Sequence, residues 1–402
     1  MRGLAGLMLL GLLVASPGAG SLIQVTTLVD ELDGCAAGTG CSLREALASA
    51  GDGDEIQFTV TGTIALTLGE LAPGSDVLVQ GPGAGQLAVS GNFASRVLAV
   101  AAGRSVELRD LTLRDGRAPL VGDPHGGCVK NAGALVLSGV RVEDCQARSM
   151  PSETPAAGGD GGGVFNAAGA VLVLTRCVVR LGRAGAGGGD PFSPPPGGRG
   201  GGVFNLGTAT VTESTLELNR AGGGGGPTGA GGDGGGIHSG GTLLLERSTV
   251  AANSSGDGAQ FCAPTCANGR DGKGGGLWAS GETTLNNVTV SGNTIGSAPE
   301  GLSNVGGGLV LAPTAGVIDR LRNVTVAANT ASGAGGGLAR EGAGTVRLRH
   351  TILGTNVAGT NDKDCTGGSA ALVSEGWNVV RIGGGCASVF GGSDQVLSLI
   401  HI

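Results

Sequence analysis

The chain has 402 residues, of which 85 are glycine, with no tyrosine, two tryptophans and seven phenylalanines. This much glycine without a strict three-residue period excludes collagen, a hydrophobic content of 40 % excludes simple disorder, and the scarcity of aromatic residues favours strands over helical bundles. The formal charge of −7 disfavours nucleic acid and anionic membranes as partners.

The first 20 residues have the pattern of an export signal. Arg2 supplies a positive charge, an apolar run spans 4–14, and small residues at 16–20 form a cleavage region. The alternative, a membrane helix, fails because about 20 apolar residues are needed to cross a bilayer. We therefore predict a signal peptide over 1–20, no further membrane span, and a secreted or cell-surface protein in which disulfides are stable.

One helix is predicted, over residues 41–50. Ser42 and Glu45 have the spacing of a capping box. The apolar face would consist of Leu43, Ala46 and Leu47. Strand-like runs at 54–118 follow and are expected to form two or three initial rungs of a stacked structure. The open end of such a stack exposes its core and unpaired strand edges, so the helix is expected to cover it.

A glycine-rich motif repeats along residues 126–356. GGGVFN stands at 161–166 and again, letter for letter, at 200–205, and degraded copies lie on either side. The period averages roughly 35 residues, which is typical of a solenoid. The third glycine position of each copy, here called the origin, is held by Cys128, Gly163, Gly202, Gly236, Gly276, Gly308 and Gly337.

Three aliphatic columns recur in every copy. The residue after the origin is Val129, Val164, Val203, Ile237, Leu277, Leu309 or Leu338. A second column contains Leu137, Leu174, Val211, Leu245, Leu285, Leu321 and Leu348, and a third contains Val142, Val179, Leu216, Val250, Val290, Val326 and Leu353. Three such columns predict three short strands per rung around a tubular core, paired in parallel with the rungs above and below. The fold predicted is all-β: a single-stranded, right-handed parallel β-helix with an N-terminal capping helix.

Each rung ends at a turn and is followed by a segment of variable length, here called an excursion. Because the distance from origin to turn is nearly constant, all excursions should leave at one corner, where the backbone is free of its neighbours. The turn residues Asn219, Asn253, Asn293, Asn329 and Asn356 are expected to take left-handed conformations and to bond locally. The glycines are expected to permit a tight corner through positive φ or close backbone approach.

The segment DELDGCAAGTGCSLREALASAGDGDEIQF at 30–58 resembles the CSLREA domain, which is found at the start of exported bacterial proteins of β-helix type. The later rungs resemble the repeats of such proteins and, more loosely, those of chlamydial polymorphic outer-membrane proteins. The resemblance covers most of residues 24–390 and implies an exported, surface-associated β-helix. It supplies no catalytic residues.

We divide the chain accordingly into a CSLREA-like cap over 21–53 and a β-helix over 54–396, whose glycine-rich repeats are followed by a C-terminal rung and loop at 357–396. The stretch 364–386 resembles the family's sequence after the last rung, beyond which the chain should run on. Residues 397–402, LSLIHI, instead resemble a translated sequencing adapter, which would mean a gene cut at a contig end. The alternative is a genuine apolar C-terminal strand.

Nine cysteines leave one unpaired if the others form bridges. The candidate pairs are Cys35 with Cys41, Cys128 with Cys145, Cys262 with Cys266, and Cys365 with Cys386. Cys177 is left over and falls in an inward column, so a buried thiol is expected rather than a nucleophile. Spacing and compartment favour disulfides over a zinc site.

A possible ligand site lies in the column two residues after the origin. It reads Lys130, Phe165, Phe204, His238, Trp278, Val310 and Ala339. Alternation points these side chains outward, so Phe165, Phe204, His238 and Trp278 would form a stacked stripe that binds a glycan or a protein. The other interpretation, which we favour, is that neighbouring excursions cover the stripe as a second small core.

Enzymatic chemistry on a β-helix needs carboxylates clustered on consecutive rungs, or a base with calcium. The outward columns gather no two acids, the four histidines are scattered, and the aspartates of the excursions (Asp160, Asp190, Asp233, Asp257 and Asp271) are interpreted as solvated. We therefore predict an exported, non-catalytic scaffold or adhesin, monomeric, binding through its excursions and without metal or cofactor. The alternative is a carbohydrate-active enzyme related to pectate lyases.

Overall fold

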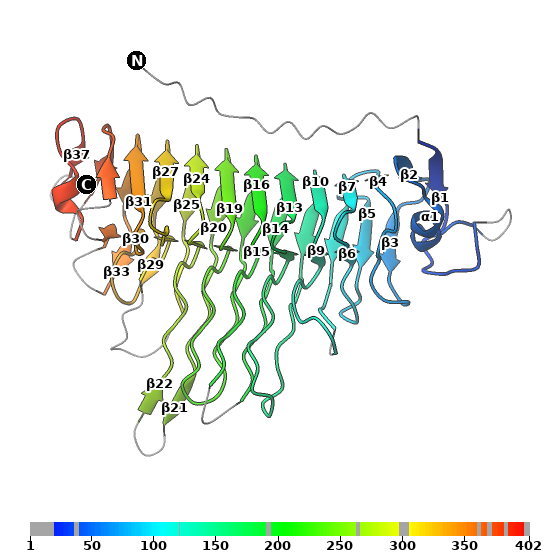
Figure 1. Cartoon of the computed structure of the whole chain (residues 1–402), viewed down its shortest axis with the longest axis horizontal. Coiled ribbons are helices and arrows are strands. Elements are labelled where there is room, and N and C mark those ends of the chain that lie inside the picture. Colours follow the sequence, from blue (N-terminus) through cyan, green and yellow to red (C-terminus); the bar gives the residue numbers. More distant parts are fainter. Residues whose placement is uncertain are drawn as a thin grey trace.

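The computed structural model describes residues 20–35, 40–119, 121–189, 194–262, 266–296, 305–359, 363–367, 372–381 and 385–397. The predicted signal peptide, apart from Gly20, and residues 398–402 lie outside this range. The chain winds into a right-handed parallel β-helix whose rungs follow one another along a single long axis (Figure 1). The predicted fold is confirmed.

Three long parallel sheets form the walls of the β-helix. The first sheet stacks β1 (Leu22–Val25), β2 (Asp54–Phe58), β4 (Val77–Gln80), β7 (Ser105–Arg109), β10 (Ala134–Ser138), β13 (Val171–Thr175), β16 (Thr208–Thr212), β19 (Thr242–Glu246), β24 (Thr283–Asn286), β27 (Ile318–Arg322), β31 (Thr345–Arg349) and β35 (Leu372–Ser374). The second sheet stacks β3 (Gly62–Ala65), β5 (Leu87–Ser90), β8 (Thr112–Arg114), β11 (Arg141–Glu143), β14 (Val178–Arg180), β17 (Thr215–Glu217), β20 (Thr249–Ala251), β25 (Thr289–Ser291), β28 (Thr325–Ala327), β32 (Ile352–Gly354), β36 (Val379–Val380) and β37 (Gln395–Val396).

The third sheet carries the strands that follow the glycine corners. It stacks β6 (Leu98–Val100), β9 (Val129–Asn131), β12 (Val164–Asn166), β15 (Val203–Asn205), β18 (Ile237–Ser239), β23 (Leu277–Ala279), β26 (Leu309–Leu311), β30 (Leu338–Arg340) and β34 (Cys365–Thr366). Minor elements are the antiparallel pair β21 (Gln260–Cys262) and β22 (Cys266–Asn268), the parallel pair β29 (Thr330–Ala331) and β33 (Val357–Ala358), and the short 3-10 helix η1 (Ala387–Val389).

Each predicted column lies in one sheet, in the predicted register. Val164 pairs with Val203, and Val203 with Ile237, along the third sheet. The columns of Leu245 and Val250 run through the first and second sheets in the same way, and these core side chains have exposed fractions near zero. Consecutive rungs thus bury the same kind of side chain at the same place, which produces one continuous apolar core.

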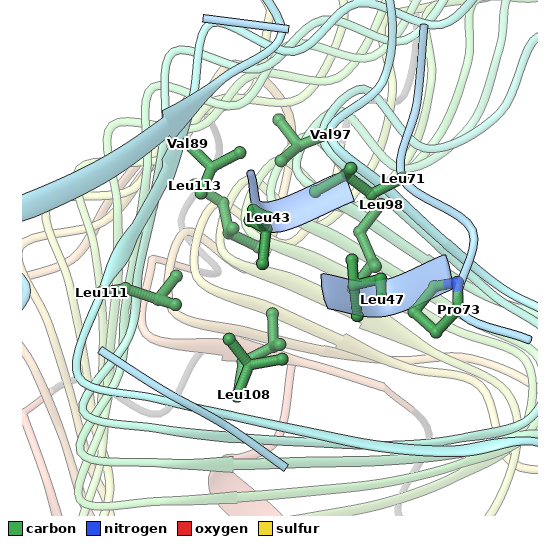
Figure 2. A pocket seen from close by; sticks show the side chains of 11 residues that line it. Leu43, Leu47, Leu71, Pro73, Val89, Val97, Leu98, Leu108, Leu111 and Leu113 are labelled. Atoms are coloured by element: carbon green, nitrogen blue, oxygen red, sulfur yellow. The ribbon is translucent and has the colours of Figure 1, made fainter. Parts of the chain in front are cut away.

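Helix α1 (Leu43–Ser49) covers the first end of this core. Ser42 caps it, its side chain accepting from the Glu45 N–H while a Glu45 carboxylate oxygen accepts from the Ser42 N–H at 2.8 Å. That bond from Ser42, joined by N–H donors at Asp33 and Gly34, lowers the pKa of Glu45 to about 2. Figure 2 shows Leu43 and Leu47 pointing towards Leu108, Leu111 and other leucines and valines of the initial rungs, around an apolar cavity of about 20 Å³.

The turn asparagines form a buried ladder along the axis. The Asn219 side-chain amide donates to Asn253 Oδ1 at 2.9 Å. In the same way Asn253 donates to Asn293, Asn293 to Asn329, and Asn329 to Asn356, at 2.9–3.0 Å. The expectation of left-handed asparagines is wrong, and of the expected local bonds the described residues show one, from Asn329 to the Ala327 carbonyl at 3.0 Å. The residue before each of them takes the positive φ, for example Leu218 at 56°, and the amides bond between rungs.

A second, shorter ladder explains the asparagine of GGGVFN. Asn131 donates to Asn166 at 2.7 Å, Asn166 to Asn205 at 2.8 Å, and Asn205 to the Ser239 hydroxyl at 3.0 Å. All are buried at the end of their strands in the third sheet. The glycine corner behaves as expected: Gly161 and Gly200, the first glycine of each motif, have φ of 70° and 66°.

The described parts of the excursions are hydrogen-bonded to one another, contrary to the expectation that their backbone is free of neighbours. They run away from the β-helix side by side (Figure 1), with outgoing legs at 184–188, 221–225 and 255–258 and returning legs at 156–160, 195–199, 229–233 and 269–273. Along an outgoing leg every third N–H bonds to the next rung, as Ala184 does to Arg220 and Gly187 to Gly223, both at 3.0 Å. A three-residue period is that of a polyproline II helix.

Outgoing and returning legs are also bonded to each other. The N–H of Gly198 donates to Gly185, that of Gly222 to Gly198, and that of Gly232 to Gly222, each at 2.8 Å. The legs are so close that a Cβ on Gly222 would lie 1.8 Å from the Gly185 carbonyl oxygen. We call this two-layered structure the glycine array.

Three disulfides are present in the described part of the chain, Cys35–Cys41, Cys128–Cys145 and Cys365–Cys386, as expected. Cys177 is free and buried, and burial raises the pKa of its thiol to about 11, so it is no nucleophile. The backbone of β21 and β22 places Cys262 opposite Cys266, but their side chains lie outside the description.

Candidate functional site: a groove over an aromatic ladder

The four predicted aromatic residues lie in one stack on the outer face of the third sheet. Ring centroids are 5.4 Å apart between Phe165 and Phe204, 5.0 Å between Phe204 and His238, and 4.3 Å between His238 and Trp278. Parallel pairing of consecutive strands imposes this stacking, because it places each ring above the equivalent ring of the next rung. We call it the aromatic ladder.

The excursions cover much of the aromatic ladder. Phe165, Phe204 and His238 have exposed fractions of 9, 1 and 3 %, while Trp278 is half-buried. Burial holds the pKa of His238 well below its usual range, so the ring is neutral and packs as an aromatic. The favoured interpretation, a second small core, therefore describes Phe204 and His238.

His125 extends the ladder by one ring and was missed by the sequence. The expected column holds Lys130 in that rung, but the His125 ring stacks on Phe165 at 4.7 Å from the preceding returning segment. His125 and His238, expected to be scattered, thus belong to the same stack. Both faces of Phe165 and Phe204 are occupied by other rings, and only ring edges point to the side.

A ladder of alternating charges runs beside the rings, three residues before the origins of four consecutive rungs. It consists of Asp160, Arg199, Asp233 and Lys273, and His125 precedes it with its Nδ1 accepting from the Asp160 N–H at 2.9 Å. The Asp160 carboxylate accepts from the Arg199 backbone N–H at 2.7 Å and pairs with its guanidinium at 3.2 Å. Asp233 accepts from the Lys273 N–H at 2.8 Å and pairs with Arg270 at 3.1 Å. We call it the charge ladder.

The prediction that the excursion aspartates are solvated is wrong for two of them. Asp160 is 7 % exposed and Asp271 is fully buried, accepting from the Gly258 N–H at 2.7 Å. Asp257 pairs with Arg220, and Asp190 lies outside the described residues. The sequence signal for the charge ladder was present in the alternation of sign at a fixed distance from the origin.

A groove of about 750 Å³ lies between the aromatic ladder and the returning legs. Its floor is formed by His125, Phe165 and Phe204, and its wall by Ala156, Ala157, Pro196 and Gly231. Arg199 reaches into it with its guanidinium carbon 4.9 Å from the Phe204 ring centroid, and Arg270, Asp233 and Leu206 border it. The groove thus combines a mostly covered apolar floor, where Phe165 and Phe204 are 9 and 1 % exposed, with fixed donors and acceptors.

The described carboxylates of the groove are held in ion pairs and by backbone N–H donors, which fix their orientation. The described residues group into possible cation ligands only near the cap, in the sets Cys35, Cys41 and Glu45, and Glu31, Asp33 and Glu45. Two of these, Cys35 and Cys41, are already joined in a disulfide. Within the described range, no helix has the length and apolar character needed to span a membrane.

No protein-family model and no curated protein matches the chain. Solved structures that are similar include pectate lyase Pel9A, with a TM-score of 0.38, 11 % identity, and coverage of 88 % of this chain and 80 % of that one. A mannuronic acid specific family 6 polysaccharide lyase from human gut microbiota has a TM-score of 0.30 and 12 % identity, covering 94 % and 91 %. The Dettilon tailspike protein has a TM-score of 0.31 and 11 % identity, covering 93 % and 68 %.

Proposed function

We propose that the protein is an exported, non-catalytic β-helix of the scaffold or adhesin type, which binds a glycan in the groove over the aromatic ladder. The observation that carries this proposal is the groove itself, where ring edges meet guanidinium and carboxylate groups held in fixed positions. Sugars present hydroxyls and C–H groups at the same time, and such a lining offers partners to both. The CSLREA-like start and the signal-like leader support export, with the protein acting as a monomer.

The enzymatic alternative is less well supported. Cleavage of a glycosidic bond by two carboxyls needs one to donate a proton and the other to attack or to activate water. Asp160 and Asp233 are instead each engaged by a backbone N–H and an arginine. Solved structures of polysaccharide lyases share the parallel β-helix, but that likeness concerns the fold.

Leu206→Trp tests the binding site. Leu206 borders the groove and is 41 % exposed, so a larger side chain there obstructs the groove without entering the core. We expect a glycan-array screen of the full chain to give positive signals that Leu206→Trp loses. Leu68→Trp, an equally exposed leucine outside the groove at 53 %, serves as the matched control and should bind normally. Identical array profiles for both variants and the parent would contradict the proposal, and release of sugar from a bound glycan would favour the enzyme.

A further inference from the structure

A patch of four arginines lies on the outer face of the first sheet, far along the chain from the groove. Strands β27 and β31 are paired in parallel, with Arg320 opposite Arg347 and Arg322 opposite Arg349. Paired residues of neighbouring strands are about 4.8 Å apart, and next-nearest residues along a strand about 6.7 Å. The four guanidinium groups therefore form a two-by-two arrangement on a flat surface.

The arrangement is electrostatically unfavourable in the protein alone. Like charges directly opposite each other destabilise a sheet. Arg320 and Arg347 are compensated by Glu282 at 3.4 Å and Glu375 at 3.0 Å. Arg322 and Arg349 are exposed, and no residue in the described part of the chain forms an ion pair with either. In a chain of net charge −7, these two opposed arginines, which form no ion pair among the described residues, are available to an anion from outside.

An exposed tryptophan borders the same patch. Asn323, His350 and Trp377 occupy the bend after the first sheet in three consecutive rungs, since the Asn323 N–H donates to Arg349 at 3.1 Å and the His350 N–H to Gly376 at 3.3 Å. Trp377 is 64 % exposed and has φ of 61°. A bulky side chain at positive φ is strained, and here burial does not compensate for it.

We propose that this surface, formed by Arg322, Arg349, His350 and Trp377, binds an acidic polysaccharide, a linear chain of carboxylated sugars. Guanidinium groups bind carboxylates through two parallel hydrogen bonds, and a tryptophan face packs on the C–H side of a sugar ring. The chain would lie across the bend, with carboxylates at the arginines and a ring on Trp377. The proposal stands independently of the groove, because the two surfaces share no residue.

Duplex nucleic acid fits the surface less well. It carries about one negative charge per 1.7 Å of helix axis, and its binding depends on many simultaneous phosphate contacts. Here only two arginines lack a carboxylate, and Glu282 and Glu375 stand beside the other two. A polymer with one carboxylate per sugar matches this sparse charge and repels the acidic residues less.

Binding of the full chain to polygalacturonate and to alginate, measured by calorimetry at low and moderate salt, tests the proposal. We expect the parent to bind at least one of them, more weakly as salt rises. The double variant Arg322→Gln, Arg349→Gln should weaken binding by about tenfold or more, equivalent to 1.4 kcal/mol. It should melt no lower than the parent, because it removes a repulsion. Trp377→Asn should also bind more weakly; asparagine is chosen because it tolerates the positive φ at this position.

The double variant Arg141→Gln, Arg183→Gln is the matched control. Both arginines are exposed and lie on earlier rungs, and their loss changes the net charge equally. The proposal is overturned if the control weakens binding as much as the patch variant, if the patch variant binds like the parent, or if neither polysaccharide binds. Equal affinity for a duplex DNA would identify a general polyanion surface and overturn the assignment to sugars. Leu206→Trp should leave this binding unchanged, so failure of the groove proposal can be distinguished from failure of this one.

Discussion

At the scale of single residues, the buried amides bond the rungs to one another. Asn293 donates its side-chain N–H to Val250 O at 2.9 Å and to Asn329 Oδ1 at 2.9 Å. Its own Oδ1 accepts from the backbone and the side chain of Asn253 at 2.9 and 3.0 Å. Every polar atom of the amide is therefore used, and its neighbours depend on it.

Asn293→Ala should strongly destabilise the middle of the β-helix. The substitution removes the side-chain partner of the buried Val250 carbonyl and of the buried Asn253 N–H, whereas Asn329 Oδ1 keeps the backbone N–H of residue 293; each group left without a partner costs about 1–3 kcal/mol. We expect a clear fall in the midpoint of urea unfolding followed by circular dichroism. Asn286→Ala, on the outer face of β24, is the control and should change the midpoint little. Equal midpoints for the two variants would show that the ladder contributes no stability.

Asp319 is an ionisable residue inside the apolar core. Asp319 points inward from β27, between Thr283 of the rung before and Val346 of the rung after. One carboxylate oxygen accepts from the Thr283 N–H at 2.8 Å, and the other is buried without a hydrogen-bond partner. Burial raises its pKa to about 7, with a smaller contribution from Glu282. The carboxyl is therefore protonated in the folded protein at a pH where the unfolded chain has already lost that proton.

The free energy of unfolding should fall as pH rises from about 4 to about 7. In that window the folded state holds one proton more than the unfolded state at Asp319, so raising the pH favours unfolding, and the effect levels off above the folded pKa. The loss is on the order of 4 kcal/mol at most. Asp319→Asn keeps the acceptor for Thr283 and cannot ionise, so urea titrations at several pH values should show a flatter dependence. Parallel curves for parent and variant would contradict the assignment.

At the scale of elements, α1 closes an end that would otherwise pair with another chain. Leu43 and Leu47 lie on the cavity of the initial rungs (Figure 2), and β1 continues the first sheet beside β2. Residues 21–53 thus contribute both a lid and an edge strand. Sequence reasoning found the helix from its capping box but not β1, because four residues carry too little periodicity.

Leu43→Asp should uncover the first end of the β-helix. A carboxylate cannot be buried there without a partner, so the helix detaches and exposes apolar side chains and strand edges. We expect light scattering to show oligomers that grow with protein concentration. Val121→Asp, at a valine that is 89 % exposed, adds the same single negative charge and is the control. A strictly monomeric Leu43→Asp variant would mean that α1 does not protect this end.

The legs of the glycine array are elements of their own, and their tolerance of a side chain differs from one glycine to the next. A Cβ at Gly222 would meet backbone atoms at 1.8 Å, whereas at Gly223 the nearest atom is 3.6 Å away. Gly222→Ala should therefore open the array locally, and Gly223→Ala should fit. Hydrogen exchange is the measurement: amides at 198, 222 and 232 should lose protection only in the first variant. Equal protection in both would show that the legs are not packed as described.

At the scale of the whole molecule, sequence reasoning predicted the β-helix because its signal repeats. The columns of Val129, Leu137 and Val142 each recur at a fixed distance from a glycine or a turn, so register and sheet followed directly. The glycine array was not predicted, since hydrogen bonds between glycines leave no pattern in side chains. The aromatic ladder was found from its column, while His125 escaped because it reaches the stack from another position.

Because the legs of the glycine array bond to one another, shortening some excursions should affect the neighbouring ones. Replacing 183–199 and 255–272 by a few Gly and Ser residues should preserve the circular dichroism of the sheets, because the rungs keep their own bonds. The remaining legs lose partners on both sides, so limited proteolysis should now cut within 221–233 although that segment is unaltered. Resistance of 221–233 in the shortened variant would show that each excursion is stable alone.

The charge ladder restricts how the number of repeats can change. Asp160, Arg199, Asp233 and Lys273 alternate in sign from one rung to the next, and the N–H groups of Gly161, Gly200 and Gly234 donate to the carbonyls of Arg199, Asp233 and Lys273. Loss of a single copy would bring Asp160 beside Asp233, whereas loss of two would bring it beside Lys273. Like charges repel at this distance and opposite charges attract. Along this stretch, recombination between the identical GGGVFN copies, which removes or adds one repeat, should therefore cost stability, whereas a change by two repeats keeps the alternation of sign.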